Sequence, residues 1–198
     1  MARDSERAVI ELVRKVYGGR EQPTPEWLQR PGRAEGGRRW KLMRDLYGEL
    51  TDMELPDVMP PRERRTMDCV LQRRGEPPRI IEFDETQHFN RYRAQTIRRY
   101  PRSVRVAFDR RAWLAACDAK RRLEGGGFGK PKPPLFPHPD GRHRQRAYRD
   151  ALVDIMPPVH GWLPTLRIAY FDVRWLGERG AKARMDELIA ERLESANR

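Results

Sequence analysis

The stretch Arg79-Ile80-Ile81-Glu82-Phe83-Asp84-Glu85-Thr86-Gln87-His88-Phe89 places acids where a buried strand ordinarily carries apolar residues. Ile80, Ile81 and Phe83 predict a strand, and the two-residue alternation of a strand puts Glu82 and Asp84 on one face. Two neighbouring carboxylates repel each other and lose hydration when they are buried. We therefore expect a cation at this strand, and a divalent metal ion is the simplest candidate.

A second short strand is predicted just before the first. Apolar and polar side chains alternate over residues 66–72, with Asp68 pointing away from the face of Cys69. The connection at residues 73–78 contains glycine and two prolines, which favours a hairpin between strands 66–72 and 79–84. That pairing would bring Asp68 towards Glu82.

The rest of the chain predicts helices mixed with strands. Residues 22–37 and 125–141 are rich in proline and glycine and predict loops. The pattern favours one α/β unit, with a mixed β-sheet flanked by helices. We expect a single domain over 1–198, divided into an N-terminal helix and loop (1–38), a core (39–123), a loop (124–141) and a C-terminal helix-strand-helix (142–198). Helices are expected at 4–17, 40–50, 90–100, 110–123, 142–155 and the C-terminus, and further strands at 104–108 and 166–173.

The charge of the chain indicates a polyanionic partner. Its net charge is +12, and 35 of its 41 basic residues are arginine, whose planar fork suits phosphate. Genomic composition is the competing explanation for so much arginine. Residues 89–122 hold eleven Lys or Arg against two acids, and this clustering favours a binding surface.

Composition also sets expectations about compartment. Hydrophobic residues make up 38% of the chain, no apolar run approaches the length of a membrane span, and residues 1–20 mix acids and bases. We expect a soluble cytoplasmic protein that does not bind membranes. Cys69 and Cys117 are too few for a disulfide framework or a cysteine-rich zinc site, so both are expected to be buried packing residues.

Acids on a hairpin suit phosphodiester hydrolysis, in which carboxylates hold one or two Mg²⁺ ions against the phosphate. Asp68 and Glu82, with Glu49 or Asp84, would form that cage. Each acid also has a structural explanation. Asp68 and Glu49 fit solvated surface acids, and Glu82 and Asp84 could pair with arginines such as those at 91 and 93.

Asp68, thirteen intervening residues and then Glu82-Phe83-Asp84 resemble the PD-(D/E)XK nuclease superfamily. The string Ile81-Glu82-Phe83-Asp84, followed by Gln87-His88-Phe89 and a basic helix, is similar to the branch related to very-short-patch repair endonucleases. The resemblance covers residues 39–123. It implies a restriction-endonuclease-like core in which Asp68, Glu82 and the carbonyl of Phe83 bind metal, and it matches Glu49 to the acid that some members contribute to a second metal.

The chain departs from that pattern at three positions. Met67 stands before Asp68 in place of proline, Glu85 stands in place of glycine, and Asp84 stands where the superfamily usually has lysine. Without the lysine, activation of water would fall to the metal, Asp84 or His88. The alternative role for His88 is to cap the following helix. The zinc ligands of very-short-patch repair enzymes have no cysteine equivalents here, so no structural zinc is expected.

These observations predict a Mg²⁺-dependent DNA endonuclease, with Mn²⁺ as a substitute, of a restriction-like or repair-like kind. Duplex DNA is the expected partner. Cutting both strands would require a homodimer, whereas a nicking enzyme works as a monomer. The alternatives are a non-catalytic nucleic-acid-binding protein of the same fold and an RNA-directed nuclease. Helix 142–155 and the loop before it are candidates for groove or base contact, because the catalytic core does not need them. The candidate nucleic-acid contacts are Arg91, Arg93, Arg98, Arg99, Arg142, Arg144 and Arg146.

Overall fold

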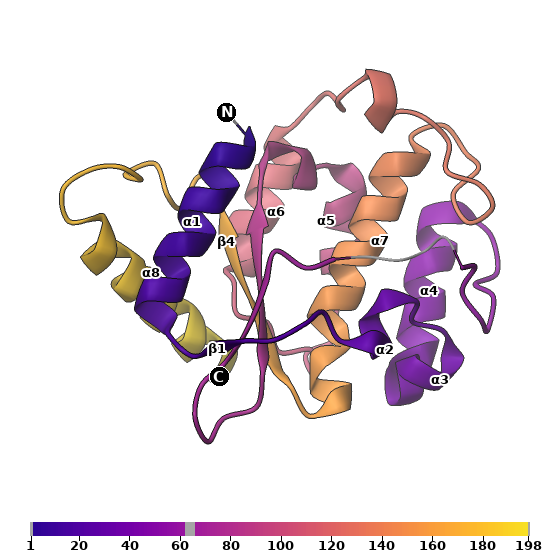
Figure 1. Cartoon of the computed structure of the whole chain (residues 1–198). Helices are drawn as coiled ribbons and strands as arrows, with labels where there is room; N and C mark the ends of the chain where they lie inside the picture. Colours follow the sequence, from indigo (N-terminus) through magenta and orange to yellow (C-terminus); the bar gives the residue numbers. More distant parts are fainter. Residues whose placement is uncertain (1, 62–65, 198) are drawn as a thin grey trace.

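A four-stranded mixed sheet runs through the centre of the molecule, and helices cover both of its faces (Figure 1). The structure is a computed structural model that describes residues 2–61 and 66–197. The strands follow the order β1-β2-β3-β4; β1 pairs antiparallel with β2, β2 antiparallel with β3, and β3 parallel with β4. The predicted α/β class with a mixed sheet is confirmed, as is the hairpin. The strands are β1 (Arg20–Glu21), β2 (Cys69–Gln72), β3 (Arg79–Asp84) and β4 (Leu163–Ala169).

Helices α1 (Ala2–Tyr17) and α8 (Ala181–Asn197) pack on one face of the sheet. Val9, Val13 and Tyr17 recur every four residues, so they form the buried stripe of α1. The helix ends where Gly18 takes a φ of 72°, a conformation that glycine adopts at little cost. Their partners on the sheet include Cys69 and Ile81, which confirms that Asp68 belongs to the opposite face.

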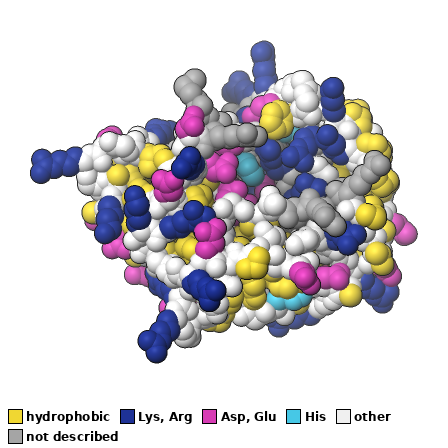
Figure 2. Space-filling model, viewed as in Figure 1, with side chains coloured by type: hydrophobic (Ala, Val, Ile, Leu, Met, Phe, Trp, Pro, Cys, Tyr) yellow, Lys and Arg dark blue, Asp and Glu magenta, His cyan; other side chains and the backbone are white. Residues whose placement is uncertain are grey.

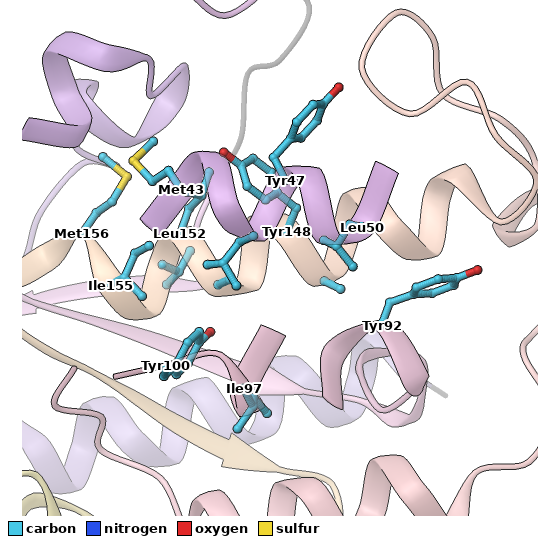
Figure 3. Close-up of a cluster of buried hydrophobic side chains, with 14 of the residues drawn as sticks. Met43, Tyr47, Leu50, Tyr92, Ile97, Tyr100, Tyr148, Leu152, Ile155 and Met156 are labelled. Carbon is cyan, nitrogen blue, oxygen red and sulfur yellow. The ribbon is translucent and has the colours of Figure 1, made fainter. Parts of the chain in front are cut away.

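The other face is covered by α4 (Trp40–Thr51), α5 (Arg91–Arg98), α6 (Arg110–Ala119) and α7 (Gly141–Ile155). Side chains from α4, α5 and α7 meet in one apolar cluster (Figure 3). Asn90 and Asp109 cap α5 and α6, because each side chain accepts two backbone N–H bonds from the first turn. Short elements fill the connections: α2 (Glu26–Gln29), α3 (Arg33–Gly36), and 3₁₀ turns at Gly37–Arg39, Thr86–His88, Gly126–Phe128 and Pro157–His160.

The expected strand at residues 104–108 is wrong as a continuous element. Only Ala107 pairs, through an isolated parallel bridge to Leu166. The backbone before it is engaged locally, because Val104 N donates to Pro101 O and the carbonyl of Val104 accepts from the Arg110 guanidinium. The strand expected at 166–173 likewise ends at Ala169, whose N–H donates to the Asp172 carboxylate as the chain turns.

Helix α7, a predicted candidate for groove or base contact, is also part of the hydrophobic core. Eleven of its fifteen residues are buried, and its apolar side chains Ala151, Leu152 and Ile155 belong to the cluster shared with α4 and α5. The preceding loop is anchored too, since Leu135 and Phe136 are buried and Tyr47 donates a hydrogen bond of 2.6 Å to the carbonyl of Leu135.

Both cysteines are free and buried, as predicted from their contexts. Among the described residues, no helix has the length and apolar character needed to cross a membrane. Lys and Arg side chains are spread widely over the face of the molecule drawn in Figure 2.

Candidate active site

Asp68 and Glu82 meet across the β2–β3 hairpin. Asp68 directly precedes β2, and the pairing of Cys69 with Ile81 sets it opposite Glu82. The Asp68 carboxylate accepts a 2.8 Å hydrogen bond from the backbone N–H of Phe83, and the Glu82 carboxylate accepts one of 3.3 Å from the N–H of Asp68. The hairpin therefore fixes both acids with its own backbone, as the alternation predicted.

Within the described part of the chain, neither carboxylate forms an ion pair, and the charges of Arg167 near Glu82 and of His88 near Asp68 do not offset their burial. Glu82 is only 8% exposed, and burial together with the charge of Asp68 raises its pKa well above the ordinary value. Burial also raises the pKa of Asp68 to about 6, although the hydrogen bond from Phe83 opposes the change; the charge of Glu6 adds to the increase. A cation placed between the two carboxylates would relieve this cost.

His88 forms a dyad with Asp150 of α7. The ring Nδ1 of His88 lies 2.9 Å from the Asp150 carboxylate and 3.6 Å from that of Asp84. Burial lowers the pKa of His88, but these two carboxylates outweigh it and the net pKa is raised. Burial would raise the pKa of Asp150, yet the charges of His88, Arg167 and Arg93 hold it below its usual range. An ionised carboxylate only accepts, so Nδ1–H is the donor and Nε2 is left for a ligand.

Asp84 lies in a closed network of buried charges. It is fully buried, and its carboxylate accepts from Arg167 Nη1 at 2.6 Å and from Trp113 Nε1 at 2.8 Å. Arg167 also contacts Asp154 at 2.7 Å, and Asp154 in turn accepts from Arg93 at 2.8 Å. Asp84 is absent from the walls of the pocket that holds Asp68 and Glu82. The structure therefore pairs it with Arg167 instead of presenting it to a substrate.

A pocket of about 570 Å³ opens over the acids. Its walls bring the two predicted ligands and His88 together with side chains from three helices and a loop. On the face drawn in Figure 2, acidic side chains, a histidine and a group of basic side chains lie together near the middle. The lining of this pocket includes Glu6, Asp68, Glu82, Phe83, His88, Arg142, Arg146, Arg149 and Asp150.

A model of a family of unknown function, DUF7255, matches residues 41–191, about three quarters of the chain. The chain belongs to the DUF7255 family. The region that matches the DUF7255 model includes the hairpin, His88 and the α7 side of the pocket, and α1 lies outside it. No curated protein and no solved structure matches the chain.

Of the acids on the helices that precede the hairpin, Glu6 lines this pocket, whereas Glu49 lies elsewhere. Glu49 of α4 borders a different depression and forms a 2.5 Å ion pair with Arg99. Glu6 comes from α1, and its charge acts on Asp68. Both acids lie on amphipathic helices that precede the hairpin, and the prediction chose the nearer helix in sequence.

The predicted arginine contacts divide into four groups. Arg142 and Arg146 line the pocket. Arg91, Arg98 and Arg99 are exposed and pair with Asp140, Asp118 and Glu49, respectively. Arg93 is fully buried against Asp154 and Tyr100, so its prediction as a surface phosphate contact is wrong. Arg144 binds the carbonyls of Leu50 and Pro139 and lies over the ring of Tyr92.

His88 does not cap α5, because the side chain of Asn90 fills that role. Among the described residues, no three His, Cys, Asp or Glu side chains form a group arranged to hold a metal ion. Asp68 and Glu82, with the Phe83 carbonyl expected beside them, offer only oxygen donors. This donor set fits Mg²⁺, which is typically held by one or two carboxylates and keeps its other positions for water and substrate phosphate.

Proposed function

We propose that this protein is a metal-dependent DNA endonuclease with a restriction-endonuclease-like core. One observation carries the proposal: the carboxylates of Asp68 and Glu82 form no ion pair with any described residue, and they line the same pocket as three arginines of α7. A phosphodiester bridges these two groups electrostatically once a metal ion lies between it and the acids. The hairpin followed by the basic helix α5 agrees with the pattern found in the sequence, whereas the strand expected after that helix does not form and the parallel neighbour of β3 is β4, which follows α7.

The carboxylates of Asp68 and Glu82 would hold Mg²⁺ or Mn²⁺, which supplies charge neutralisation at the phosphate and a nucleophilic water. Glu6 takes the place that the sequence assigned to Glu49, as the helix acid beside the metal ligands. Arg142 and Arg146 hold the charged substrate against the pocket wall.

His88 is the general acid that protonates the leaving oxygen. The buried network contains three carboxylates, those of Asp84, Asp150 and Asp154, and two guanidiniums, those of Arg93 and Arg167. A protonated His88 adds a third positive charge, so the three negative charges of this network are balanced. The cation that the superfamily usually draws from lysine therefore comes from His88, and Asp84 is retained as a partner of Arg167.

The proposal is tested with supercoiled plasmid, linear duplex, single-stranded DNA and RNA, each incubated with Mg²⁺, Mn²⁺ or EDTA. Wild type is expected to cut DNA with metal and to be inactive in EDTA. Asp68→Ala and Glu82→Ala are expected to lose at least about a thousandfold in rate, because the metal is no longer held. Glu178→Gln is the matched control, because Glu178 is an exposed acid paired only with Arg184 among the described residues.

Two results decide against this function. Cleavage that survives both alanine substitutions removes the assignment of the site. Binding of DNA without any cleavage, on plain and modified DNA and with either metal, favours a non-catalytic nucleic-acid-binding protein. Cleavage of RNA alone would replace the DNA substrate with RNA.

A further inference from the structure

The α7 wall of the pocket carries three arginines on one face of the helix. Arg142, Arg146 and Arg149 are separated by four and three residues, which is the spacing of neighbours along a helix surface. All three line the pocket that holds Asp68 and Glu82. The hairpin therefore contributes acids to the pocket, and α7 contributes three arginines together with Asp150.

Arg146 has the clearest signature of an anion site. Its Nη1 is buried and has no hydrogen-bond partner among the described residues. A buried donor without a partner is costly, and a phosphate oxygen would satisfy it. The guanidinium lies 5.2 Å from the ring centroid of Phe128, which stacks in turn on His143 at 5.9 Å. This stack holds the planar fork in place before any substrate arrives.

Arg146 is also close enough to His88 for its charge to lower the pKa of that ring, against the larger effect of Asp150. His88 faces the acids, since its charge acts on Asp68. Asp68, Glu82, His88 and Arg146 all line the same pocket.

The size of the pocket limits the form of that strand. A sphere of 570 Å³ is about 10 Å across, which is less than the roughly 12 Å width of the major groove of B-DNA alone. Pockets of roughly 300–1,000 Å³ take ligands of nucleotide size. Glu82 lies at the buried side of this pocket, so a rigid duplex that rests on the surface would hold its backbone away from the acid.

We propose that the pocket binds an unpaired polynucleotide strand, with one phosphodiester at Asp68 and Glu82 and a neighbouring phosphate held by Arg146. The placement of the first phosphate rests on the proposed nuclease function, whereas the Arg146 subsite is tested by binding alone. Electrostatic contact with the strand backbone is the usual basis of single-strand binding and does not depend on base sequence.

The test measures fluorescence anisotropy of a fluorescein-labelled 12-nucleotide DNA strand and of the blunt duplex of the same sequence. The full chain is used with Ca²⁺ in place of Mg²⁺. Wild type is expected to bind the single strand about tenfold more tightly than the duplex. Arg146→Met keeps an unbranched side chain and removes the guanidinium with its charge. It is expected to weaken single-strand binding about tenfold and to lower the salt slope by about 0.7.

Arg179→Met is the matched control, because Arg179 is exposed and does not line the pocket. It is expected to leave single-strand binding unchanged. If wild type binds the duplex as tightly as the single strand or more tightly, the proposal of an unpaired strand is wrong. If Arg146→Met and Arg179→Met have equal effects, the proposal of a phosphate subsite at Arg146 is wrong. If Arg146→Met does not fold, Arg146→Lys replaces it, since lysine keeps the charge but loses the fork. Arg146→Lys must then weaken binding more than Arg179→Lys does, and equal binding overturns the subsite.

The two proposals fail in different ways. Single-strand binding that depends on Arg146, without cleavage under any metal, supports the subsite and removes the nuclease function. Cleavage that Arg146→Met leaves unchanged keeps the nuclease function and overturns the subsite.

Discussion

Glu82 and Asp84 lie two residues apart on the same face of β3, yet their surroundings are opposite. Asp84 is fully buried and satisfied by Arg167 and Trp113. Glu82 is almost as buried, but it forms no ion pair with a described residue, and burial together with the charge of Asp68 outweighs the charge of Arg167, so its pKa is raised. Burial alone therefore does not separate a structural acid from a functional one. What separates them is whether a buried cation neutralises the charge of the acid.

This comparison explains the departure at the lysine position. A lysine at 84 would face Arg167 in a closed space, so the two cations would repel each other. An aspartate there stabilises Arg167 instead, and the network passes through Asp154 and Asp150 to His88. The same strand thus supports one acid inside the core and exposes another to the pocket.

The largest expected effect on stability comes from removing the arginine that neutralises Asp84. Arg167→Met should lower the free energy of unfolding by about 3–5 kcal/mol, because it removes the guanidinium paired with the buried Asp84 and one of the two paired with Asp154. Urea denaturation followed by circular dichroism measures the change. Adding Asp84→Asn should recover part of the loss, since one uncompensated charge disappears. A loss below about 1 kcal/mol would show that the network is not compensating charge.

Neutralising Asp68, which forms no ion pair with a described residue, should instead raise the stability of the protein. Asp68→Asn keeps an acceptor for the N–H of Phe83 and should raise stability at pH 8 by at most about 3 kcal/mol, the value for a pKa that rises from 3.8 to about 6. In wild type the folded state binds a proton at Asp68 before the unfolded state does. This part of the stability is therefore gained as pH falls from about 6 towards 4, and the advantage of Asp68→Asn disappears over that range.

Thermal unfolding at pH 8 and pH 4.5 measures this difference, with Glu178→Gln as the control for an exposed acid. Mg²⁺ should raise the melting temperature of wild type at pH 8 and have little effect at pH 4.5, because it binds the ionised carboxylates. An Asp68→Asn variant that is less stable than wild type at pH 8 contradicts the view that Asp68 is uncompensated.

The hairpin was predictable because its signal is local. Alternation fixed which face Asp68 and Glu82 share, and glycine and proline fixed the turn between the strands. The role of Asp84 was not predictable in this way, because its partner Arg167 lies 83 residues away. The sequence did contain a clue. Arg167 stands between Leu166 and Ile168 on an apolar strand, and a charge in that position requires a buried acid.

The remaining site residues depend on packing between distant helices. Asp150 reaches His88 only because α7 crosses the sheet beside it, and its sequence position on a basic helix suggested a surface role. Glu6 and Glu49 are equivalent as patterns, since each is an acid on an amphipathic helix. Only the arrangement of the layers, with α1 beside the hairpin and α4 on the far side of α7, distinguishes them (Figure 1).

A smaller effect is expected where the two regions meet, at the His88–Asp150 dyad. Asp150→Asn removes the carboxylate that raises the pKa of His88, while burial continues to lower it. The protonated ring is present below its folded pKa and lost above it, so the loss of activity on the alkaline side should begin at a lower pH. We expect a drop of about tenfold at pH 8 and a smaller one at pH 6. The pH–rate profile measures this, and an unchanged profile contradicts the assignment of His88 as the acid.

The smallest effect should come from an ion pair of similar geometry at the surface. Arg98 Nη2 lies 2.7 Å from both carboxylate oxygens of Asp118, close to the 2.6 Å between Arg167 and Asp84, but these side chains are 51% and 54% exposed. Water solvates either partner when the other is removed, so Arg98→Ala should cost no more than about 1 kcal/mol. A double-mutant cycle with Asp118→Ala isolates the pair. A coupling energy as large as that between Arg167 and Asp84 would mean that contact geometry determines the strength of an ion pair. Burial would then not explain why Asp84 and Glu82 differ.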